Sequence, residues 1–412
     1  MTLTIDRDRL LSEVETLSSF SDAETPAVTR IVFTPTDLKA RAWMKARCEE
    51  AGLTVREDAI GNTFARWNGS DPVAPVVGTG SHIDAIPNAG KYDGVVGVLG
   101  GLEAIRSLRQ SGFRPTHSIE LVIFTSEEPT RFGVGCLGSR LLSGSLSPDD
   151  ARRLKDNDGV PLDDVRRAAG FEGELEQVKL PSGYYKAFIE LHIEQGPLLE
   201  REHIPLGIVT KIASPASLRV LIEGSGGHAG GVLMPDRRDA LCAAAELILA
   251  IETAARTSGA IDTVATVGIC DVFPGAVNSI PGRVRLSVDI RDTDLQRRDI
   301  VMRAIEAASH SISAKRQVSI NSELLNADAP ADCSPAIIEA LSQSCRKHEL
   351  NFLPMVSRPY HDSLFIARIA PVAMLFTPCR SGYSHRPDEY AAPEDIVRGT
   401  LVLAETLAAL SE

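Results

Sequence analysis

The hydrophobic and polar positions of the chain follow one pattern up to about Val209 and another beyond it. In the first part, apolar runs typical of buried strands, such as His117–Thr125 and Tyr185–Ile193, alternate with helical spacing, as over Gly94–Leu108. A shorter run, Val73–Val77, ends at a series of glycines. Strands that alternate with helices predict a mostly parallel α/β sheet.

Between residues 210 and 327 the order of the predicted elements changes. A strand, a helix, two strands, a helix and a strand follow one another, over Leu218–Glu223, Asp236–Ser258, Thr263–Phe273, Val284–Arg291, Asp294–Lys315 and Val318–Asn326. This β-α-β-β-α-β order resembles the ferredoxin-like split unit, whose exposed sheet edge can pair in a dimer. The predicted fold class is therefore α/β. A discontinuous domain (1–209 and 328–412) carries a mostly parallel mixed sheet, and a ferredoxin-like α+β domain (210–327) is inserted for dimerisation or closure.

Composition narrows the class of protein. A chain of 412 residues fits two domains, and a net charge of −12 disfavours nucleic acid and anionic membranes as main partners. No apolar run approaches membrane-spanning length, and the amino-terminal segment lacks the basic and apolar regions of a secretory signal. The seven cysteines stand singly, without a C-x-x-C pair, as in reduced cytosolic proteins. We therefore expect a cytoplasmic protein.

Side chains that can bind metal ions follow the ends of several predicted strands, where open α/β sheets place their ligand sites. They are His82, Asp84 and Asp93 after the first strand, Glu127 and Glu128 after the next, His192 at the end of a third, and His385 after a strand at Val372–Pro378. A single His and Asp would more often form a polar surface loop, and a Glu-Glu pair alone a solvated acidic turn. The hypothesis of a metal site therefore depends on the whole set.

Five members of the set offer three imidazoles and two carboxylates without a thiolate: His82, Asp93, Glu128, His192 and His385. Such donors suit two borderline divalent ions, Zn²⁺ or Mn²⁺, with one carboxylate bridging them. Two ions about 3.5–4 Å apart lower the pKa of a shared water and polarise a carbonyl. Glu127, left outside the ligand set, can take the proton of that water and pass it to a leaving nitrogen.

The same residues carry a resemblance to a known family. His82-x-Asp84 with Asp93-Gly94, Glu127-Glu128 and His192-x-Glu194-Gln195-Gly196 resemble, in order, the motifs of the M20-type metallopeptidase and amidohydrolase superfamily. The His-x-Glu-Gln-Gly form is similar to the branch of allantoate amidohydrolases and N-carbamoyl-amino-acid hydrolases.

Three further segments, Gly226–Pro235, Ser357–Ser363 and Pro378–Pro387, are most similar to the ureidoglycolate amidohydrolases of that branch. The carbamoyl-amino-acid enzymes tend to carry small residues where the second segment has Arg358, Pro359 and Tyr360.

This resemblance implies two divalent ions per subunit, with manganese favoured and zinc the alternative. His82, Asp93 and His192 would hold one ion and Asp93, Glu128 and His385 the other, with Glu127 as general base and Asp84 orienting His82. The resemblance also implies substrate contacts, with His228 donating to the oxyanion and Arg291 binding a carboxylate. These contacts are Gln195, His228, Asn278, Arg291, Tyr360 and His361.

The implied function is cleavage of the ureido C–N bond of ureidoglycolate to glyoxylate, ammonia and carbon dioxide, in purine breakdown. The implied assembly is a homodimer whose active sites are completed by the neighbouring subunit. Allantoate and N-carbamoyl-L-amino acids are the alternative substrates. An aminopeptidase is disfavoured by the Gln195 motif, and a non-catalytic dimeric binding protein should have lost metal ligands, none of which is missing.

Overall fold

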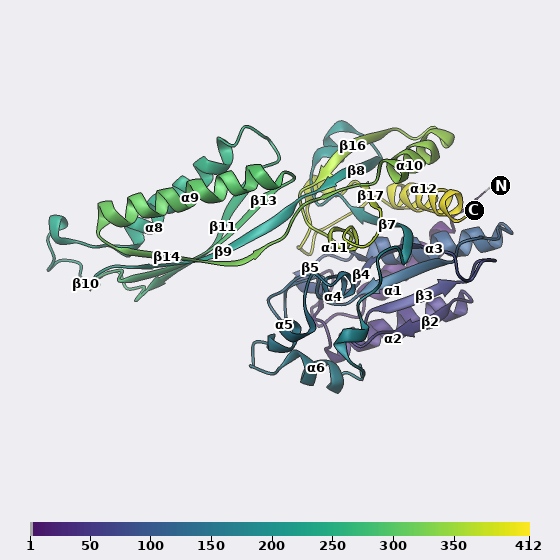
Figure 1. Cartoon of the computed structure of the whole chain (residues 1–412), viewed down its shortest axis with the longest axis horizontal. Helices are drawn as coiled ribbons and strands as arrows, with labels where there is room; N and C mark the ends of the chain where they lie inside the picture. The colour runs from purple at the N-terminus through teal and green to yellow at the C-terminus, as the bar shows by residue number, and fades with distance from the viewer. Residues whose placement is uncertain (1–2) are drawn as a thin grey trace. The chain divides into compact units, whose positions relative to one another are not determined.

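The computed structural model describes residues 3–412, and the chain divides into two compact units. The first contains the chain up to Thr210, Asp332–Ser357 and His361–Glu412, and the second contains Lys211–Ala331 with Arg358–Tyr360. Figure 1 colours both along the sequence. The domain boundaries 1–209, 210–327 and 328–412 remain predictions. Residues 328–331 and Arg358–Tyr360 group with the second unit, although both lie in the predicted carboxyl-terminal part of the first domain.

A nine-stranded mixed sheet forms the centre of the first unit. Its order is β15 (Ala331–Asp332), β8 (Leu206–Ile212), β17 (Val372–Thr377), β7 (Tyr185–Ile193), β4 (Val76–His82), β6 (Ile119–Phe124), β3 (Thr63–Trp67) and β2 (Thr54–Glu57), with β16 (Phe352–Ser357) pairing with β8. The strands β17, β7, β4 and β6 are parallel, and the pairs β17–β8, β6–β3 and β3–β2 are antiparallel. The parallel strands are almost wholly buried, as expected for apolar runs covered on both faces. The predicted α/β fold class is confirmed.

Helices complete the first unit. The longer ones are α1 (Arg7–Ser18), α2 (Pro35–Glu50), α3 (Val95–Gln110), α10 (Pro335–Lys347) and α12 (Pro393–Ser411), and the shorter elements are β1 (Val28–Arg30), β5 (Ala85–Ala89), α4 (Leu137–Ser143), α5 (Pro148–Arg153), α6 (Leu162–Ala168), α7 (Leu198–Glu202) and α11 (Asp362–Ile366), with 3₁₀ turns at Leu175–Gln177 and Arg380–Gly382. Helix α3 can pack closely on the sheet because Gly97 has no side chain. A Cβ at this position would lie 2.3 Å from the carbonyl oxygen of Leu191. Within residues 3–412, no helix is both long and apolar enough to span a bilayer.

The second unit contains a four-stranded antiparallel sheet in the order β11 (Val264–Phe273), β13 (Arg283–Asp292), β9 (Ser214–Glu223) and β14 (Ser319–Ala327). Helices α8 (Ala240–Arg256) and α9 (Leu295–Arg316) supply apolar side chains to its core. A short β10–β12 pair (Gly227–His228 and Ser279–Ile280) and a 3₁₀ turn at Met234–Asp236 complete it. The order of its main elements is the β-α-β-β-α-β order of the ferredoxin-like unit.

Candidate metal centre

The candidate ligands come from neighbouring strands of the parallel centre. His82 is the last residue of β4, and Asp93 precedes α3. Glu128 follows β6, and His192 lies near the end of β7. Because β6, β4 and β7 are adjacent and parallel, their carboxyl ends meet at one edge of the sheet.

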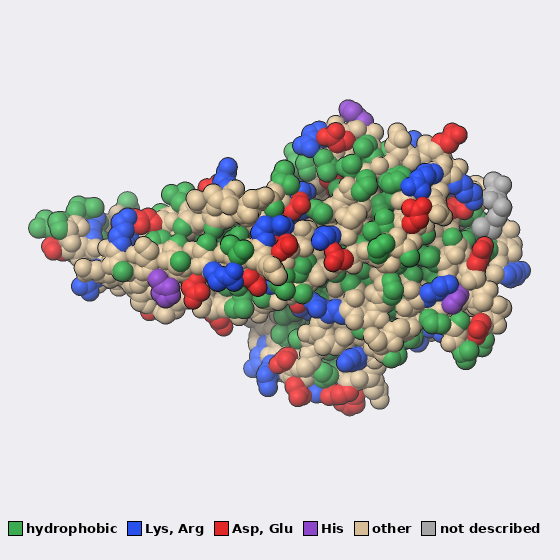
Figure 2. Space-filling view, turned by 45° about the horizontal axis from the view of Figure 1, so that its top comes forward, with side chains coloured by type: hydrophobic (Ala, Val, Ile, Leu, Met, Phe, Trp, Pro, Cys, Tyr) green, Lys and Arg blue, Asp and Glu red, His purple; other side chains and the backbone are tan. Residues whose placement is uncertain are grey.

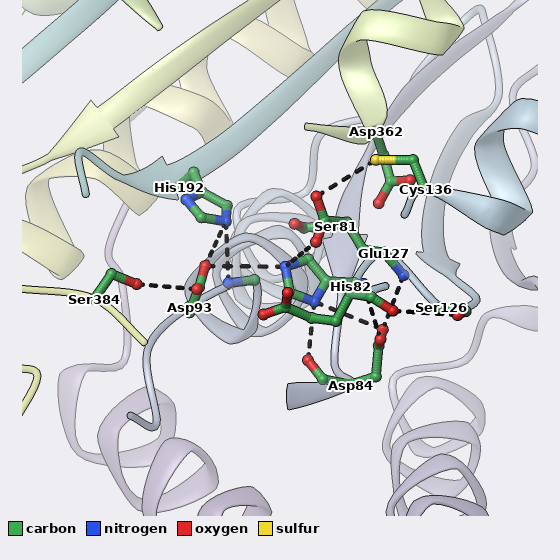
Figure 3. Close-up of polar contacts among 12 residues, drawn as sticks. Ser81, His82, Asp84, Asp93, Ser126, Glu127, Cys136, His192, Asp362 and Ser384 are labelled. Carbon is green, nitrogen blue, oxygen red and sulfur yellow. Dashed lines mark hydrogen bonds and ion pairs between the residues drawn. The ribbon is translucent and has the colours of Figure 1, made fainter. Parts of the chain in front are cut away.

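Asp93 lies between two groups of donor atoms. Its Oδ1 is 3.1 Å from Nε2 of His192 and 3.9 Å from Nε2 of His82, as Figure 3 shows for the residues it labels. Its Oδ2 is 3.0 Å from Nε2 of His385, which in turn is 3.3 Å from Oε1 of Glu128. In each group, the three ligand atoms lie within 4.8 Å of one another.

The orientation of the imidazoles fits metal binding. Nδ1 of His82 is 3.0 Å from the backbone carbonyl of Asp84, and Nδ1 of His192 is 2.9 Å from the carbonyl of Ile193. A carbonyl only accepts, so each Nδ1 carries the proton and, in the neutral ring, Nε2 presents its lone pair towards Asp93. The backbone N–H of Gly94 lies 3.1 Å from Nε2 of His192 and can donate to it when the ring is neutral. Nitrogen and oxygen donors in two groups that share one carboxylate are suited to a pair of divalent ions.

Asp84 contacts His82 differently from what the sequence implied. The His82 ring donates its Nδ1–H to the backbone carbonyl of Asp84, whereas the carboxylate Oδ1 of Asp84 is 3.7 Å from Nδ1. That carboxylate instead accepts the backbone N–H groups of Glu127 (3.2 Å) and Glu128 (3.1 Å). Burial, and then the charge of Glu128, raises the pKa of Asp84 to about 8. Asp84 therefore fixes the backbone of the Glu-Glu pair.

Glu127 lies beside the first donor group. Its Oε2 is 3.8 Å from Nε2 of His82, and its Oε1 accepts a hydrogen bond from the thiol of Cys136 at 3.4 Å (Figure 3). Burial, followed by the charge of Glu128, raises the pKa of Glu127 well above its usual value. A carboxylate with a raised pKa is a better proton acceptor, as a general base requires.

The charges of the remaining donors are tightly linked. Burial lowers the pKa of His82 to about 4. Burial also opposes ionisation of His192 and Asp93. The hydrogen bond between them nevertheless raises the pKa of His192 to about 8. Together with the hydrogen bond from His385, it lowers the pKa of Asp93 well below its usual value. Hydrogen bonds to Asp93 and then Glu128 raise the pKa of His385 to about 11. Without ions, protonated imidazoles thus balance the buried carboxylates.

The residues predicted to contact substrate divide between the two units. In the first, the amide nitrogen of Gln195 donates to both oxygens of Asp93 at 3.0 Å. His361 is buried, and the centre of its ring lies 4.4 Å from the centre of the His192 ring. The others, His228, Asn278, Arg291 and Tyr360, belong to the second unit. There the Arg291 guanidinium pairs with Asp289 at 2.7 Å and lies 5.5 Å from the centre of the Tyr360 ring.

Two residues at the centre were absent from the sequence predictions. The hydroxyl of Ser384 is 3.0 Å from Oδ2 of Asp93 and 2.9 Å from Oε2 of Glu389. Glu389 is buried, and burial followed by the charge of Asp93 raises its pKa to about 7. The available signal was a serine directly before His385 and a glutamate four residues after it.

Comparison with known proteins agrees with this geometry, because residues 78–409 match peptidase family M20/M25/M40. The chain belongs to this family. A ureidoglycolate hydrolase of Arabidopsis thaliana is 51% identical to it, over 99% of this M20 chain and 87% of that protein. An N-carbamoyl-L-amino-acid amidohydrolase of Pseudomonas sp. (strain NS671) is 38% identical over 98% and 99%.

The fold of this M20 protein also matches a solved structure. The crystal structure of AtUAH in complex with (S)-hydroxyglycine has a TM-score of 0.92 and 50% identity, covering 99% of this chain and 98% of that one. The predicted family, the hydrolase class and the similarity to ureidoglycolate and carbamoyl-amino-acid enzymes are confirmed. Family membership and the two donor groups also support the use of divalent metal ions.

Proposed function

We propose that this M20 protein is a metal-dependent amidohydrolase that hydrolyses the ureido group of ureidoglycolate. Water adds to the ureido carbonyl and the bond to its terminal nitrogen breaks, which gives ammonia and a carbamate. The carbamate then loses carbon dioxide, which breaks the second C–N bond and gives hydroxyglycine. Hydroxyglycine then loses ammonia and becomes glyoxylate. The substrate class is supported by identity of about half over the full chain with a ureidoglycolate hydrolase, and by the solved complex of a similar protein with (S)-hydroxyglycine.

The observation that carries the chemistry is the division of the Asp93 carboxylate between two donor groups. His82, Asp93 and His192 would hold one ion, and Asp93, Glu128 and His385 the other. We favour Mn²⁺ over Zn²⁺ because the sequence motifs resemble those of family members for which manganese is favoured. Two such ions, when bound, supply a water of lowered pKa and polarise the substrate carbonyl.

Glu127 acts as the general base in this proposal. It takes a proton from the attacking water and delivers it to the leaving nitrogen. The nitrogen then leaves as a neutral amine or ammonia and not as an anion. Two contacts support the role: Asp84 fixes the backbone of Glu127, and Cys136 donates to Oε1 of Glu127. Its Oε2 is then directed towards the donor group of His82.

The proposed substrate contacts are those that the family resemblance implies, and the chemistry of two side chains supports them. The guanidinium fork of Arg291 suits the substrate carboxylate, and His228 can donate to the oxygen as the carbonyl becomes tetrahedral. Gln195, Asn278, Tyr360 and His361 complete the set of contacts that we propose.

We further propose a cytoplasmic homodimer in which residues 210–327 of one subunit complete the active site of the other. Exposed apolar side chains on the second unit support an interface there, among them Leu233, Met234, Ile269, Phe273 and Val277. Figure 2 shows one face of the molecule with its hydrophobic side chains in green. Mixing an Arg291→Ala subunit with a Glu127→Ala subunit should then restore part of the activity. No restoration, with mixed dimers present, would contradict shared sites.

The substrate is tested by assaying metal-stripped protein reloaded with Mn²⁺ against ureidoglycolate, allantoate and N-carbamoyl-L-amino acids in parallel. We expect the highest kcat/KM for ureidoglycolate. A higher value for allantoate or for a carbamoyl amino acid would replace the proposed substrate and leave the metal chemistry intact. Dipeptides are added to the panel as a further substrate class. Hydrolysis of dipeptides alone would indicate an aminopeptidase, and no hydrolysis of any substrate would indicate a binding protein.

A further inference from the structure

A hydrogen-bonded network joins two segments that lie nearly three hundred residues apart. Oε1 of Glu389 accepts the backbone N–H groups of Tyr92 (2.8 Å) and Asp93 (3.1 Å). Its Oε2 is 2.9 Å from the hydroxyl of Ser384, which is itself 3.0 Å from Oδ2 of Asp93. One buried carboxylate thus contacts the backbone that carries Asp93 and the residue directly before His385.

The space around Glu389 depends on a glycine. A side chain at Gly90 would place its Cβ 2.3 Å from Cβ of Glu389 and 2.4 Å from Oε1. The loop that carries Asp93 can therefore lie against the carboxylate only because residue 90 has no side chain.

His385 needs such support because its backbone is strained. Its φ is +60°, a left-handed backbone conformation that residues other than glycine rarely adopt. A conformation of this kind persists when the surrounding contacts determine it. Ser384 and Glu389, on either side of His385, supply contacts of this kind and direct them to Asp93.

We propose that Glu389 is a positioning residue that sets the separation of Asp93 and His385, so that both ions can bind at once. The proposal rests on the metal centre of the proposed function. Glu389 does not bind an ion in this arrangement. It acts through Asp93, which both donor groups share. It also acts through Ser384, which is next to His385, a ligand of the second group only. Loss of the Glu389 carboxylate should therefore lower the affinity for the ion held by Glu128 and His385 more than the affinity for the ion held by His82 and His192.

The test measures Mn²⁺ binding to metal-stripped full-length protein by calorimetry, with bound metal counted after dialysis. We expect wild type to bind two ions and Glu389→Ala to bind one of them about 10–100-fold more weakly, the usual range for residues that orient ligands. Glu389→Gln should bind like wild type, since its amide oxygen can accept the two N–H groups and its NH₂ can donate to Ser384. Asp388→Ala is the matched control, because Asp388 is exposed on the same loop and pairs with Arg386.

Two results would overturn the proposal. Wild-type affinity for both ions in Glu389→Ala is one, and equal loss of both ions in Glu389→Ala and Glu389→Gln is the other. If Glu389→Ala does not fold, Ser384→Ala and Gly90→Ala take its place, and normal binding of both ions by both variants would have the same meaning. A wild type that binds two ions but does not hydrolyse ureidoglycolate would remove the proposed function and leave this inference standing.

Discussion

The carboxylate of Asp84 accepts the backbone N–H of Glu128 at 3.1 Å. Together with its hydrogen bond from Glu127 N–H, this contact fixes the turn that presents a ligand on one side chain and the base on the next. The His82 ring is held separately, by a backbone carbonyl.

Asp84→Asn should therefore impair the base more than the first metal ligand. The amide offers one oxygen for two N–H groups, so one buried donor loses its acceptor, at a cost of about 1–3 kcal/mol. We expect kcat to fall by about ten- to a hundredfold while the protein retains Mn²⁺. Metal content and kcat measured on the same sample test this. Loss of the ion of His82 and His192 with little change in kcat per bound ion would instead favour the side chain as the partner of the His82 ring.

Glu127→Gln should separate proton transfer from metal binding. The amide keeps the shape of the side chain but cannot accept the proton of the attacking water, so kcat should fall by about 10²–10⁴-fold with both ions bound. Glu128→Gln is the contrasting variant, and there we expect loss of the ion that His385 helps to hold. Near-normal turnover by Glu127→Gln would assign the base to another residue.

Metal affinity should rise with pH. His385, with its pKa raised to about 11, and His192, with its pKa raised to about 8, are protonated in the metal-free protein at neutral pH. An imidazole binds a metal ion only after it loses its proton, so binding releases protons and low pH favours the free protein. Calorimetry in buffers of different ionisation enthalpy should show proton release, and the affinity for Mn²⁺ should weaken as pH falls below 8. An affinity that is independent of pH would contradict these protonation states.

Gly94→Ala should damage the metal centre, whereas Gly112→Ala should cost only stability. Both glycines flank α3 and have left-handed φ angles, +67° and +81°. A Cβ at Gly94 would lie 2.5 Å from Nε2 of His82, but one at Gly112 meets nothing within 4 Å. Gly112→Ala should lose about 1–2 kcal/mol of stability from backbone strain. Gly94→Ala should lose more because its Cβ also overlaps His82, and only Gly94→Ala should lose Mn²⁺ as well. Thermal denaturation and metal content of the two proteins distinguish the effects.

The motifs around the metal ligands predicted the family, and the alternation of strands and helices predicted the α/β fold. A parallel sheet brings the ends of its strands together. His82 and His192 lie at the ends of two strands and Glu128 follows a third, and these strands pair side by side, so the proximity of the three residues could be anticipated. The partner of the Asp84 carboxylate could not. In continued extended backbone Asp84 would share a face with His82, but β4 ends at His82 and the side chain meets the Glu-Glu backbone instead.

Contacts between distant segments were equally invisible in the sequence. The bond from Glu389 to the backbone of Asp93 spans almost three hundred residues, and nothing in the local pattern around Glu389 indicates its partner. The roles of the individual site residues remain predictions that the variants above test.

The grouping of Arg358–Tyr360 with the second unit has a consequence for protein engineering. Arg358 pairs with Asp262 at 2.6 Å, and Tyr360 lies beside Arg291. Residues 211–331 are therefore not a self-contained cassette. Excising them, or grafting them onto another enzyme, would leave behind a tripeptide that forms part of their own packing, and a swap between relatives should carry both pieces together.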